Sequence, residues 1–541
     1  MELSNGTDLC ANFVFGKSSV LQLLDCTPLA PYLPLILLTV FTSILFYVLA
    51  LTADKYLCPA LVELSKLLGL SESLAGVTLV AFGNGAPDVF SALSGIRQNK
   101  SSMVFSQLFG SGAFVSALVA GIVMIVVPPF DVDWPSFSRD MIFYMSGSIF
   151  TFYVFYRSKI HLMHAVAFVA IYVIYIAAVG LFSSYWQSEQ TLELDEEAMS
   201  DHSSLYGSMK SVFDSALSVV RATKSNNLTD PVVLTSSYGT FDQSGSTLFD
   251  SGRFTEDTSS HFIFAELVLH TLPWTWDKLR GMPWYSQAKS ILLLPVNLLL
   301  SLTIPVVDRD VFKSNWCKTL NTVHCVLTPA FTVFLFSGDF DVYGVPLSLC
   351  VLPVSLTLGA LVFCTSRINE APKYHVAFAL MGFAASVAWI FRTCEILVCT
   401  LSAIGTVMGI PDSIMGLTVL SWGSSLGDLV TNIAIAKHGY ASMAISAAFG
   451  GILLDMLLGL GIPYAILVLS TEEWVMELEW TYAVVPLFAG VVSFILVASA
   501  GLYSNQWRTS KLQGCVFISI YAITVTVSVA ISIAESLGGF T

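Results

Sequence analysis

Runs of about twenty apolar residues recur along this chain of 541 residues, and they restrict its fold more than any other feature. In the interior of a bilayer, every backbone N–H and C=O group must be satisfied within the protein, so such runs form helices. Only 11% of the residues are charged, whereas 55% are hydrophobic. So little charge cannot cover the surface of a soluble protein. We therefore predict an all-α protein that crosses a membrane many times.

The apolar runs fall into two groups that are separated by a polar stretch, residues 187–286. Each run is long enough, or nearly long enough, to span the hydrocarbon core. The candidate spans are 32–53, 72–95, 103–127, 140–156, 162–186, 287–306, 319–337, 343–364, 375–404, 412–436, 441–470, 478–500 and 514–534.

The segments outside these spans complete the predicted organisation. Residues 1–31 form an N-terminal extramembrane segment, and 187–286 form an acidic, Ser-rich hydrophilic loop. The end of this loop, 263–286, combines tryptophans with basic residues, which indicates a position at the membrane interface. Residues 32–186 would then be a first bundle, and residues 375–541 a second.

Signals of targeting and modification are few. Residues 1–27 contain one basic residue, Lys17, so we predict no cleavable targeting segment there. Cys10 and Cys26 could form a disulfide if their segment is extracytoplasmic. Sequons for N-glycosylation occur at Asn5, Asn99 and Asn227; five predicted spans separate Asn5 from Asn227, so at most one of these two faces a glycosylating lumen. The formal net charge of -14 argues against a nucleic-acid partner.

An internal repeat organises the two groups of spans. Residues 69–121, shifted by 340 positions, match residues 409–461 without a gap at thirteen of fifty-three positions. The matched residues are mostly Gly, Ser, Thr and Asp rather than the Leu and Val that lipid-facing positions favour. Duplicated halves with glycine-interrupted apolar segments are typical of secondary transporters, whose binding site lies where the repeats meet.

Each repeat contains an apolar segment that ends in an aspartate. In the first, Gly83-Asn84-Gly85-Ala86-Pro87 precedes Asp88, and in the second, Gly423-Ser424-Ser425-Leu426-Gly427 precedes Asp428. Glycines relax a helix and proline removes a backbone donor, so we predict a helix break in both motifs. The carbonyl groups freed by such a break would need a partner inside the membrane, and a cation would supply one.

A third acid, Asp455, follows Asp428 on the next predicted span. An ionised Asp at the centre of a membrane helix costs about 2.5–3.5 kcal/mol on insertion scales. Three such carboxylates repel one another unless cations neutralise them. Oxygen ligands suit Ca²⁺ and Na⁺, and because no His or Cys joins the set, it suits neither zinc nor copper. We predict that Asp88, Asp428 and Asp455 bind transported cations.

Two readings from other classes remain open at this point. An intramembrane aspartyl protease would also place two aspartates on neighbouring helices, but Ser425-Leu426-Gly427-Asp428 lacks the first glycine of the Gly-x-Gly-Asp motif. A non-transporting scaffold or sensor could retain the same fold. Neither reading accounts for the repeat together with Asp455 as directly as cation transport does.

The two motifs resemble the α-repeats of the cation/calcium exchanger superfamily, and within it the mitochondrial-type sodium/lithium/calcium exchangers. The resemblance implies two inverted five-helix bundles and an antiporter, not an enzyme, that exchanges Ca²⁺ for Na⁺ or Li⁺ by alternating access and needs no organic cofactor. It also implies the mitochondrial inner membrane, with the plasma membrane as the alternative. The oligomeric state stays open.

The resemblance also assigns residues to the ion site. Asp88 and Asp428 correspond to the central acidic ligands, and Asp455 to the acidic or amide residue of the following helix. Further candidate ligands from the motifs and their flanks are Asn84, Ser424, Ser425, Ser111 and Gly451. Val115 stands where many relatives have Asn, and Ser424 and Asp455 stand where the mitochondrial type usually has Asn, so the charge balance of this site differs.

Inversion of the repeats imposes a condition on the spans. Equivalent helices of inverted repeats must be an odd number of spans apart, but 72–95 and 412–436 are the second and the tenth candidates. One candidate is therefore not a full span. The two suspects are 287–306 and 319–337, which contain proline and polar residues. The remaining two spans within 287–374 would be extra helices inserted before the second bundle.

Overall fold

The structure is a computed structural model of the chain. It describes residues 33–68, 81–200, 267, 271, 280–281, 283–308, 312–337, 341–342, 345–367, 370–437, 441–469, 475–478 and 480–537. Cys10, Cys26, Asn5 and Asn227 lie outside the described residues, as do most residues of the predicted interfacial segment 263–286. Asn99 is exposed in the connection between two helices.

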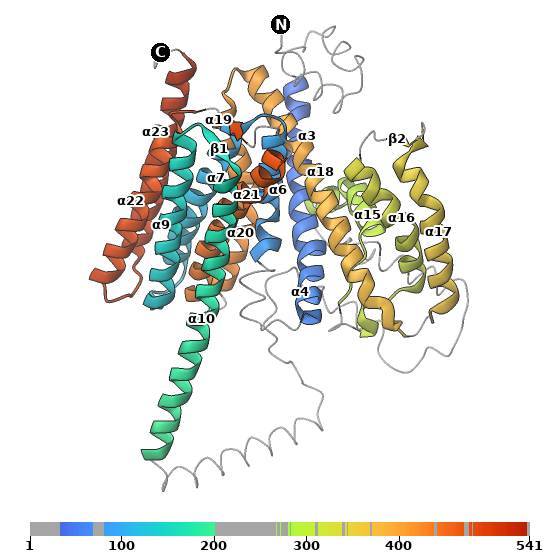
Figure 1. The fold of residues 1–541 in the computed structure, drawn as a ribbon, viewed down its shortest axis with the longest axis horizontal. Coiled ribbons are helices and arrows are strands. Elements are labelled where there is room, and N and C mark those ends of the chain that lie inside the picture. The colour runs from blue at the N-terminus through green and yellow to red at the C-terminus, as the bar shows by residue number, and fades with distance from the viewer. Residues whose placement is uncertain are drawn as a thin grey trace. The chain divides into compact units, whose positions relative to one another are not determined.

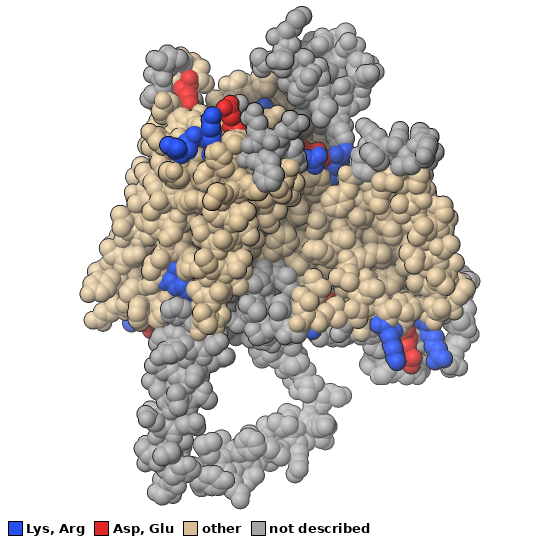
Figure 2. All heavy atoms as spheres, in the orientation of Figure 1, with Lys and Arg blue, Asp and Glu red and all other residues tan. Residues whose placement is uncertain are grey.

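The described residues are almost entirely helical, as predicted (Figure 1). Nine helices in the described part of the chain are long and apolar enough to cross a membrane. Figure 2 shows a broad band of uncharged surface, with the visible Lys, Arg, Asp and Glu side chains near its two edges. This distribution fits a bilayer around the band, because charged side chains are expensive within hydrocarbon.

The first half of the chain contains five consecutive helical segments. They are α3 (Leu33–Thr52) with η1 (Ala53–Leu57) and α4 (Cys58–Leu67), then α6 (Ala81–Arg97), then α7 (Ser101–Ala113) with η3 (Phe114–Val119) and α8 (Ala120–Val126), then α9 (Trp134–Tyr156), and α10 (Leu162–Ser200). Helix α10 continues to Ser200, past the residue at which the hydrophilic loop was predicted to begin.

The second half repeats this plan. Its segments are α18 (Val376–Met408), then α19 (Asp412–Met415) with η7 (Gly416–Leu420) and α20 (Ser421–Lys437), then α21 (Ala441–Leu469), α22 (Val484–Ser504) and α23 (Lys511–Ser536). Short strands β1 (Lys159–His161) and β4 (Val475–Glu477) pair antiparallel and join a connection of the first half to one of the second.

The segment between the halves contains α14 (Trp284–Leu292), α15 (Leu294–Thr303), η5 (Phe312–Asn315), α16 (Lys318–Ser337), the hairpin of β2 (Asp341–Val342) and β3 (Val345–Pro346), α17 (Leu347–Thr365), and η6 (Lys373–His375). The candidate span 287–306 is divided between α14 and α15, which have nine and ten residues and are each too short to cross the hydrocarbon core. Two long helices, α16 and α17, remain as the insertion, in agreement with the parity argument.

Contacts between connections show that the halves are inverted. Lys100, just after α6, forms an ion pair with Asp412, just before η7 and α20, with Nζ and Oδ2 2.7 Å apart. Thus α6 ends at the same side of the bundle where the segment leading into α20 begins. Because α6 and α20 are equivalent helices of the repeat, they run in opposite directions. At the other side, Thr509 N–H donates to the Phe130 carbonyl at 2.9 Å.

The first helix packs along α18, its counterpart. Leu57 and Leu61 lie in one apolar cluster with Ile390 and Leu397, and all four are fully or almost fully buried. The inserted helices contact the other flank of α18, where the indole N–H of Trp389 donates to Thr303 Oγ1 at 2.9 Å. These contacts hold η1 and α18 beside the crossing of α6, α20 and α21.

Candidate ion-binding site

The predicted breaks within the two motifs are wrong. Helix α6 runs without interruption through Pro87, and α20 runs without interruption through Gly423 to Gly427. One proline removes a single backbone hydrogen bond, which a packed helix tolerates. In the second repeat, the departure from α-helical geometry lies one turn earlier, in the π-helix η7. Single-turn π segments of this kind often occur at functional sites.

Glycine serves close packing in these motifs rather than helix breakage. A Cβ atom built on Gly85 would overlap the carboxylate of Asp455, and one on Gly423 would overlap the ring of Phe46. The absence of a side chain at Gly85 therefore allows α6 and α21 to approach at the level of Asp455. This approach brings the third predicted acid within one turn of Asp88.

Asp88 is buried, with 3% of its surface exposed. The amide nitrogen Nε2 of Gln107 on α7 donates to Asp88 Oδ1 at 2.8 Å. The Ser424 side chain on α20 also lies beside the Asp88 carboxylate. The two repeats therefore meet at this carboxylate, because α6 supplies the acid and α20 supplies the hydroxyl.

Asp428 faces a small cavity. Its lining includes Ser424 and Gly427 from α20, Pro87 from α6, and Asp54 from η1. The volume of about 30 Å³ is sufficient for one or two water molecules or a dehydrated cation. Ser424 Oγ donates to the Leu420 carbonyl at 2.9 Å, which leaves its lone pairs available to a cation.

Asp455 is also buried, with 6% of its surface exposed, and its Oδ1 atom has no hydrogen-bond partner. The charges of Asp88 and Asp428 both act on it, so the three carboxylates are near enough to repel one another. A buried carboxylate oxygen without a partner is strongly unfavourable. A cation placed among these residues would neutralise the repulsion and would supply a partner for Asp455 Oδ1.

The carboxylates do not form a closed cage. Within the described ranges, no three Asp, Glu, His or Cys side chains are grouped so that they could hold one metal ion. Hydroxyl and carbonyl oxygens would have to complete the coordination of a bound ion, which is compatible with the preference of Ca²⁺ and Na⁺ for mixed oxygen ligands.

The other predicted ligands have different surroundings. Ser425 Oγ is buried without a hydrogen-bond partner, and Ser111 Oγ donates to the Leu108 carbonyl at 3.2 Å. A Cβ atom on Gly451 would meet no atom within 4 Å, so Gly451 borders free space. Asn84 lies in α6, but its side chain is outside the described part of the structure.

Two residues at the site were missed in the sequence. Gln107 was overlooked because its repeat equivalent is Ala447, so the shift of 340 gives no match. Asp54 was overlooked because the first span was predicted to end at residue 53. In the structure, α3, η1 and α4 continue to Leu67 and place Asp54 inside the span.

The shift of 340 positions that defines the repeat could have pointed to Asp54. Cys394 on α18 lies 340 positions after Asp54. Its thiol donates to the Pro87 carbonyl at 3.6 Å, and the charge of Asp88 acts on it. Asp54 acts in the same way on Asp428. The first helix of each half therefore places one residue, Asp54 or Cys394, near the motif aspartate of the other half.

The family described as "Sodium/calcium exchanger protein" matches residues 38–181 and 378–530. The chain is 32% identical to the mitochondrial sodium/calcium exchanger protein of Homo sapiens over 489 residues, which covers 88% of this chain and 78% of that protein. It is 28% identical to cation/calcium exchanger 1 of Arabidopsis thaliana, which covers 93% of this chain and 81% of that protein.

Two solved structures are similar at lower levels. An H⁺/Ca²⁺ exchanger has a TM-score of 0.43 at 12% identity, and the similarity covers 96% of this chain and 92% of the other. A sodium-calcium exchanger has a TM-score of 0.38 at 13% identity, covering 91% and 99% of the two chains.

Proposed function

Because this chain belongs to the sodium/calcium exchanger protein family, it is an antiporter of Na⁺ and Ca²⁺, and we propose that Asp88, Asp428 and Asp455 form its transport site. The observation that carries the proposal is the buried, unpartnered Oδ1 atom of Asp455, which faces Gly85 one turn before Asp88. A transported cation would supply the missing partner of this oxygen.

Charge balance explains how one site could couple two ions. Three carboxylates need compensating positive charge, and either one Ca²⁺ or several Na⁺ can provide it. The two cargoes would therefore occupy overlapping positions and exclude each other. A site without either ion would carry uncompensated charge in a low-dielectric interior, so its passage between the two membrane sides would be slow. Because only the ion-loaded site would cross readily, Ca²⁺ flux in one direction would require Na⁺ flux in the other.

The inverted halves provide the two access routes. The cavity beside Asp428 reaches Asp54, which is exposed, whereas the equivalent Cys394 is fully buried against α6. We propose that the ion reaches the site along η1 in one state of the exchanger and along α18 in the other. Movement of one pair of helices against the other would exchange these states, as expected for transporters with inverted repeats.

The remaining ligands belong to the proposal. Ser424 and Ser425 on α20, Ser111 on α7, and Asn84 and Gly451 beside the motifs would contribute hydroxyl, amide or carbonyl oxygens. Na⁺ and Ca²⁺ would be transported substrates of this site, and we propose that it needs no organic cofactor. We propose transport rather than catalysis, since the relatives are named as exchangers, and the aspartyl protease and scaffold readings are not favoured.

The membrane follows from the relatives. The exchangers of Homo sapiens and Gallus gallus, both 32% identical, are named mitochondrial. We accordingly place this multi-pass protein in a mitochondrial membrane, and propose the inner membrane.

The decisive test is ⁴⁵Ca²⁺ uptake into proteoliposomes that contain the purified full-length protein. Opposed gradients of Na⁺, Li⁺, K⁺ and H⁺ are compared at one membrane potential. We expect uptake to depend on an outward Na⁺ gradient, and Li⁺ to replace Na⁺ if the mitochondrial-type resemblance extends to the driving ion. Calcium flux that is indifferent to both the Na⁺ and the Li⁺ gradient would refute the proposed coupling.

A further inference from the structure

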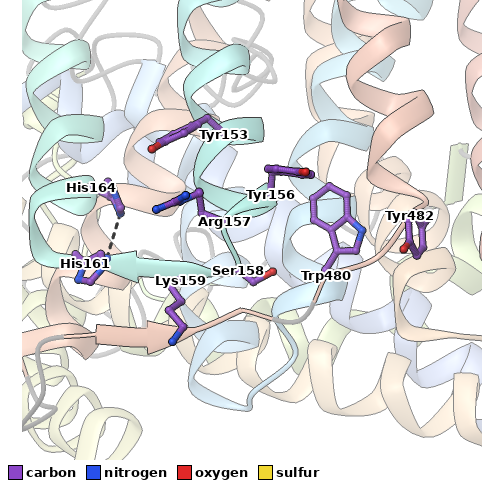
Figure 3. A pocket seen from close by; sticks show the side chains of 9 residues that line it. All are labelled: Tyr153, Tyr156, Arg157, Ser158, Lys159, His161, His164, Trp480 and Tyr482. Atoms are coloured by element: carbon purple, nitrogen blue, oxygen red, sulfur yellow. Dashed lines mark hydrogen bonds between the residues drawn. The ribbon is translucent and has the colours of Figure 1, made fainter. Parts of the chain in front are cut away.

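A second cavity lies at the end of α9, and its volume is about 830 Å³. Figure 3 shows its lining, which comes from the last turn of α9, from β1, from the first turn of α10 and from the segment before α22. The lining residues are Tyr153, Tyr156, Arg157, Ser158, Lys159, His161, His164, Trp480 and Tyr482.

The backbone presents the basic residues on one wall. Helix α9 ends at Tyr156, and Ser158 takes a positive φ of 51°, which turns the chain into β1. The Leu478 N–H donates to the Ser158 carbonyl at 2.9 Å and fixes this turn against the second half. Along β1, buried Ile160 separates exposed Lys159 and His161, so these two side chains share one face.

The cations of this wall remain available to a ligand. Lys159 Nζ lies 3.5 Å from Glu477 Oε1, but the side chains are 58% and 83% exposed, so water screens the pair and its interaction is weak. Arg157 projects toward the same space from the end of α9 (Figure 3). Its planar guanidinium can form two parallel hydrogen bonds with an oxyanion.

A histidine pair adds a donor. The backbone N–H of His161 donates to Nδ1 of His164 at 3.2 Å (Figure 3). Because Nδ1 is an acceptor in this contact, the neutral ring of His164 carries its proton on Nε2. His164 therefore presents an N–H group rather than a lone pair on its other nitrogen.

Aromatic rings form the opposite wall. The rings of Tyr156 and Trp480 meet edge to face with centroids 5.6 Å apart, and Trp480 and Tyr482 meet in the same way at 6.1 Å. Tyr153 and Tyr156 are 50% and 67% exposed. Tyrosine and tryptophan beside basic residues at the end of a membrane helix are typical of the headgroup region of a bilayer.

We propose that this cavity binds a phosphate-bearing anion. Arg157, Lys159 and the Nε2–H group of His164 would contact the phosphate oxygens, and the tyrosines and Trp480 would pack against the attached group. A volume of about 830 Å³ exceeds that needed for inorganic phosphate alone and is typical of pockets for small organic ligands. The headgroup of an anionic phospholipid and a soluble phosphate ester share the chemistry that these residues recognise.

The test measures binding directly and does not depend on transport. The detergent-purified full-length protein is examined by native mass spectrometry with phosphatidylglycerol, phosphatidylcholine, inorganic phosphate or ATP. The double variant Arg157→Ala/Lys159→Ala is compared with Lys511→Ala, which removes an exposed cation at the start of α23, on the opposite side of the bundle. Each cation is worth about fivefold in affinity for an anionic surface, so the double variant should lose about 25-fold.

The outcomes separate the sources of the ligand. Loss of phosphatidylglycerol binding alone identifies the bilayer as the source, and loss of ATP binding identifies a soluble ester. Lys511→Ala should bind as the wild type does. Equal binding of every probe by the double variant and the wild type would overturn the proposal.

A second variant distinguishes loss of ligand binding from misfolding. Arg157→Lys keeps the charge but removes the planar fork, so it should lose several-fold in binding while its thermal unfolding in detergent matches that of the wild type. Unchanged binding in this variant would contradict the assigned role of Arg157.

Discussion

Asp54 and Asp428 line the same cavity, although they belong to opposite halves of the chain. The two side chains lie on η1 and α20, and the charge of Asp54 acts on the Asp428 carboxylate. The first helix of this protein therefore contributes to the approach to the proposed ion site and not only to its frame. We therefore expect two roles: Asp428 would bind the transported ion, whereas Asp54 would attract the ion toward the site.

Asp428→Asn should abolish exchange. The amide keeps the shape of the side chain but removes one negative charge from the proposed site, so we expect Na⁺-driven ⁴⁵Ca²⁺ uptake to fall about 100-fold or more. Asp131→Asn is the matched control, because Asp131 is exposed in the connection between α8 and α9. Uptake by Asp428→Asn at the level of this control would exclude Asp428 from the transport site.

Asp54→Asn should have a smaller and different effect. Because Asp54 lines the cavity beside Asp428 without belonging to either motif, its charge would attract the ion rather than coordinate it, an effect worth roughly 1 kcal/mol. We expect the KM for Ca²⁺ to rise up to about fivefold while the maximal rate stays near that of the wild type. Initial rates across a range of Ca²⁺ concentrations distinguish this from a loss of maximal rate at unchanged KM, which would make Asp54 a ligand of the occluded ion.

Gln107→Ala should weaken transport without abolishing it. The Gln107 amide donates to Asp88 Oδ1, and a hydrogen bond to a charged group is worth about 1.5–3 kcal/mol. Loss of this bond would leave Asp88 free to reorient, so we expect a decrease of roughly 10- to 100-fold in kcat/KM. Gln107→Glu should not restore activity, because a carboxylate would repel Asp88. Wild-type uptake by Gln107→Ala would show that this hydrogen bond does not position the acid.

Gly85→Ala should damage the site through packing. The added methyl group would overlap the Asp455 carboxylate, and overpacking of this kind costs about 1–3 kcal/mol. We expect a lower unfolding temperature in detergent and loss of Ca²⁺ uptake. Gly180→Ala is the control for helix propensity, since a methyl group there would meet no atom within 4 Å. A stable and active Gly85→Ala protein would mean that α6 and α21 do not approach as described.

The ion pair between Lys100 and Asp412 should contribute little to stability. Its side chains are 33% and 24% exposed, so solvent screening limits the pair to about 1 kcal/mol. A double-mutant cycle with Lys100→Ala and Asp412→Ala, followed by denaturant unfolding in detergent, measures this coupling. A much larger value would indicate that the pair also holds one access state of the exchanger.

Much of the fold could be predicted from the sequence, because the bilayer imposes strong rules. Apolar length predicted the spans, and the shift of 340 predicted both the duplication and the pairing of Asp88 with Asp428. The parity of inverted repeats even identified 287–306 as one of two suspects for an incomplete span. These successes come from constraints that act on whole segments and not on single side chains.

The details of the site were harder to predict. The motif glycines and Pro87 suggested broken helices, but the structure uses Gly85 and Gly423 for close contacts and keeps both helices continuous. Whether a glycine permits a bend or an approach depends on its neighbours in space, which one sequence does not contain. Gln107 and Asp54 were missed for a similar reason, because each acts on an aspartate of another helix.

Because the two halves pack against each other, the bundle can be completed only late in synthesis. Phe130 bonds to Thr509, which follows it by 379 residues, and Lys100 meets Asp412 only after 312 further residues have been made. The early helices, with Asp88 among them, must therefore wait in the membrane for partners that emerge last from the ribosome. A truncated chain that ends before α22 would lack Thr509 and would leave the connection at Phe130 without its partner.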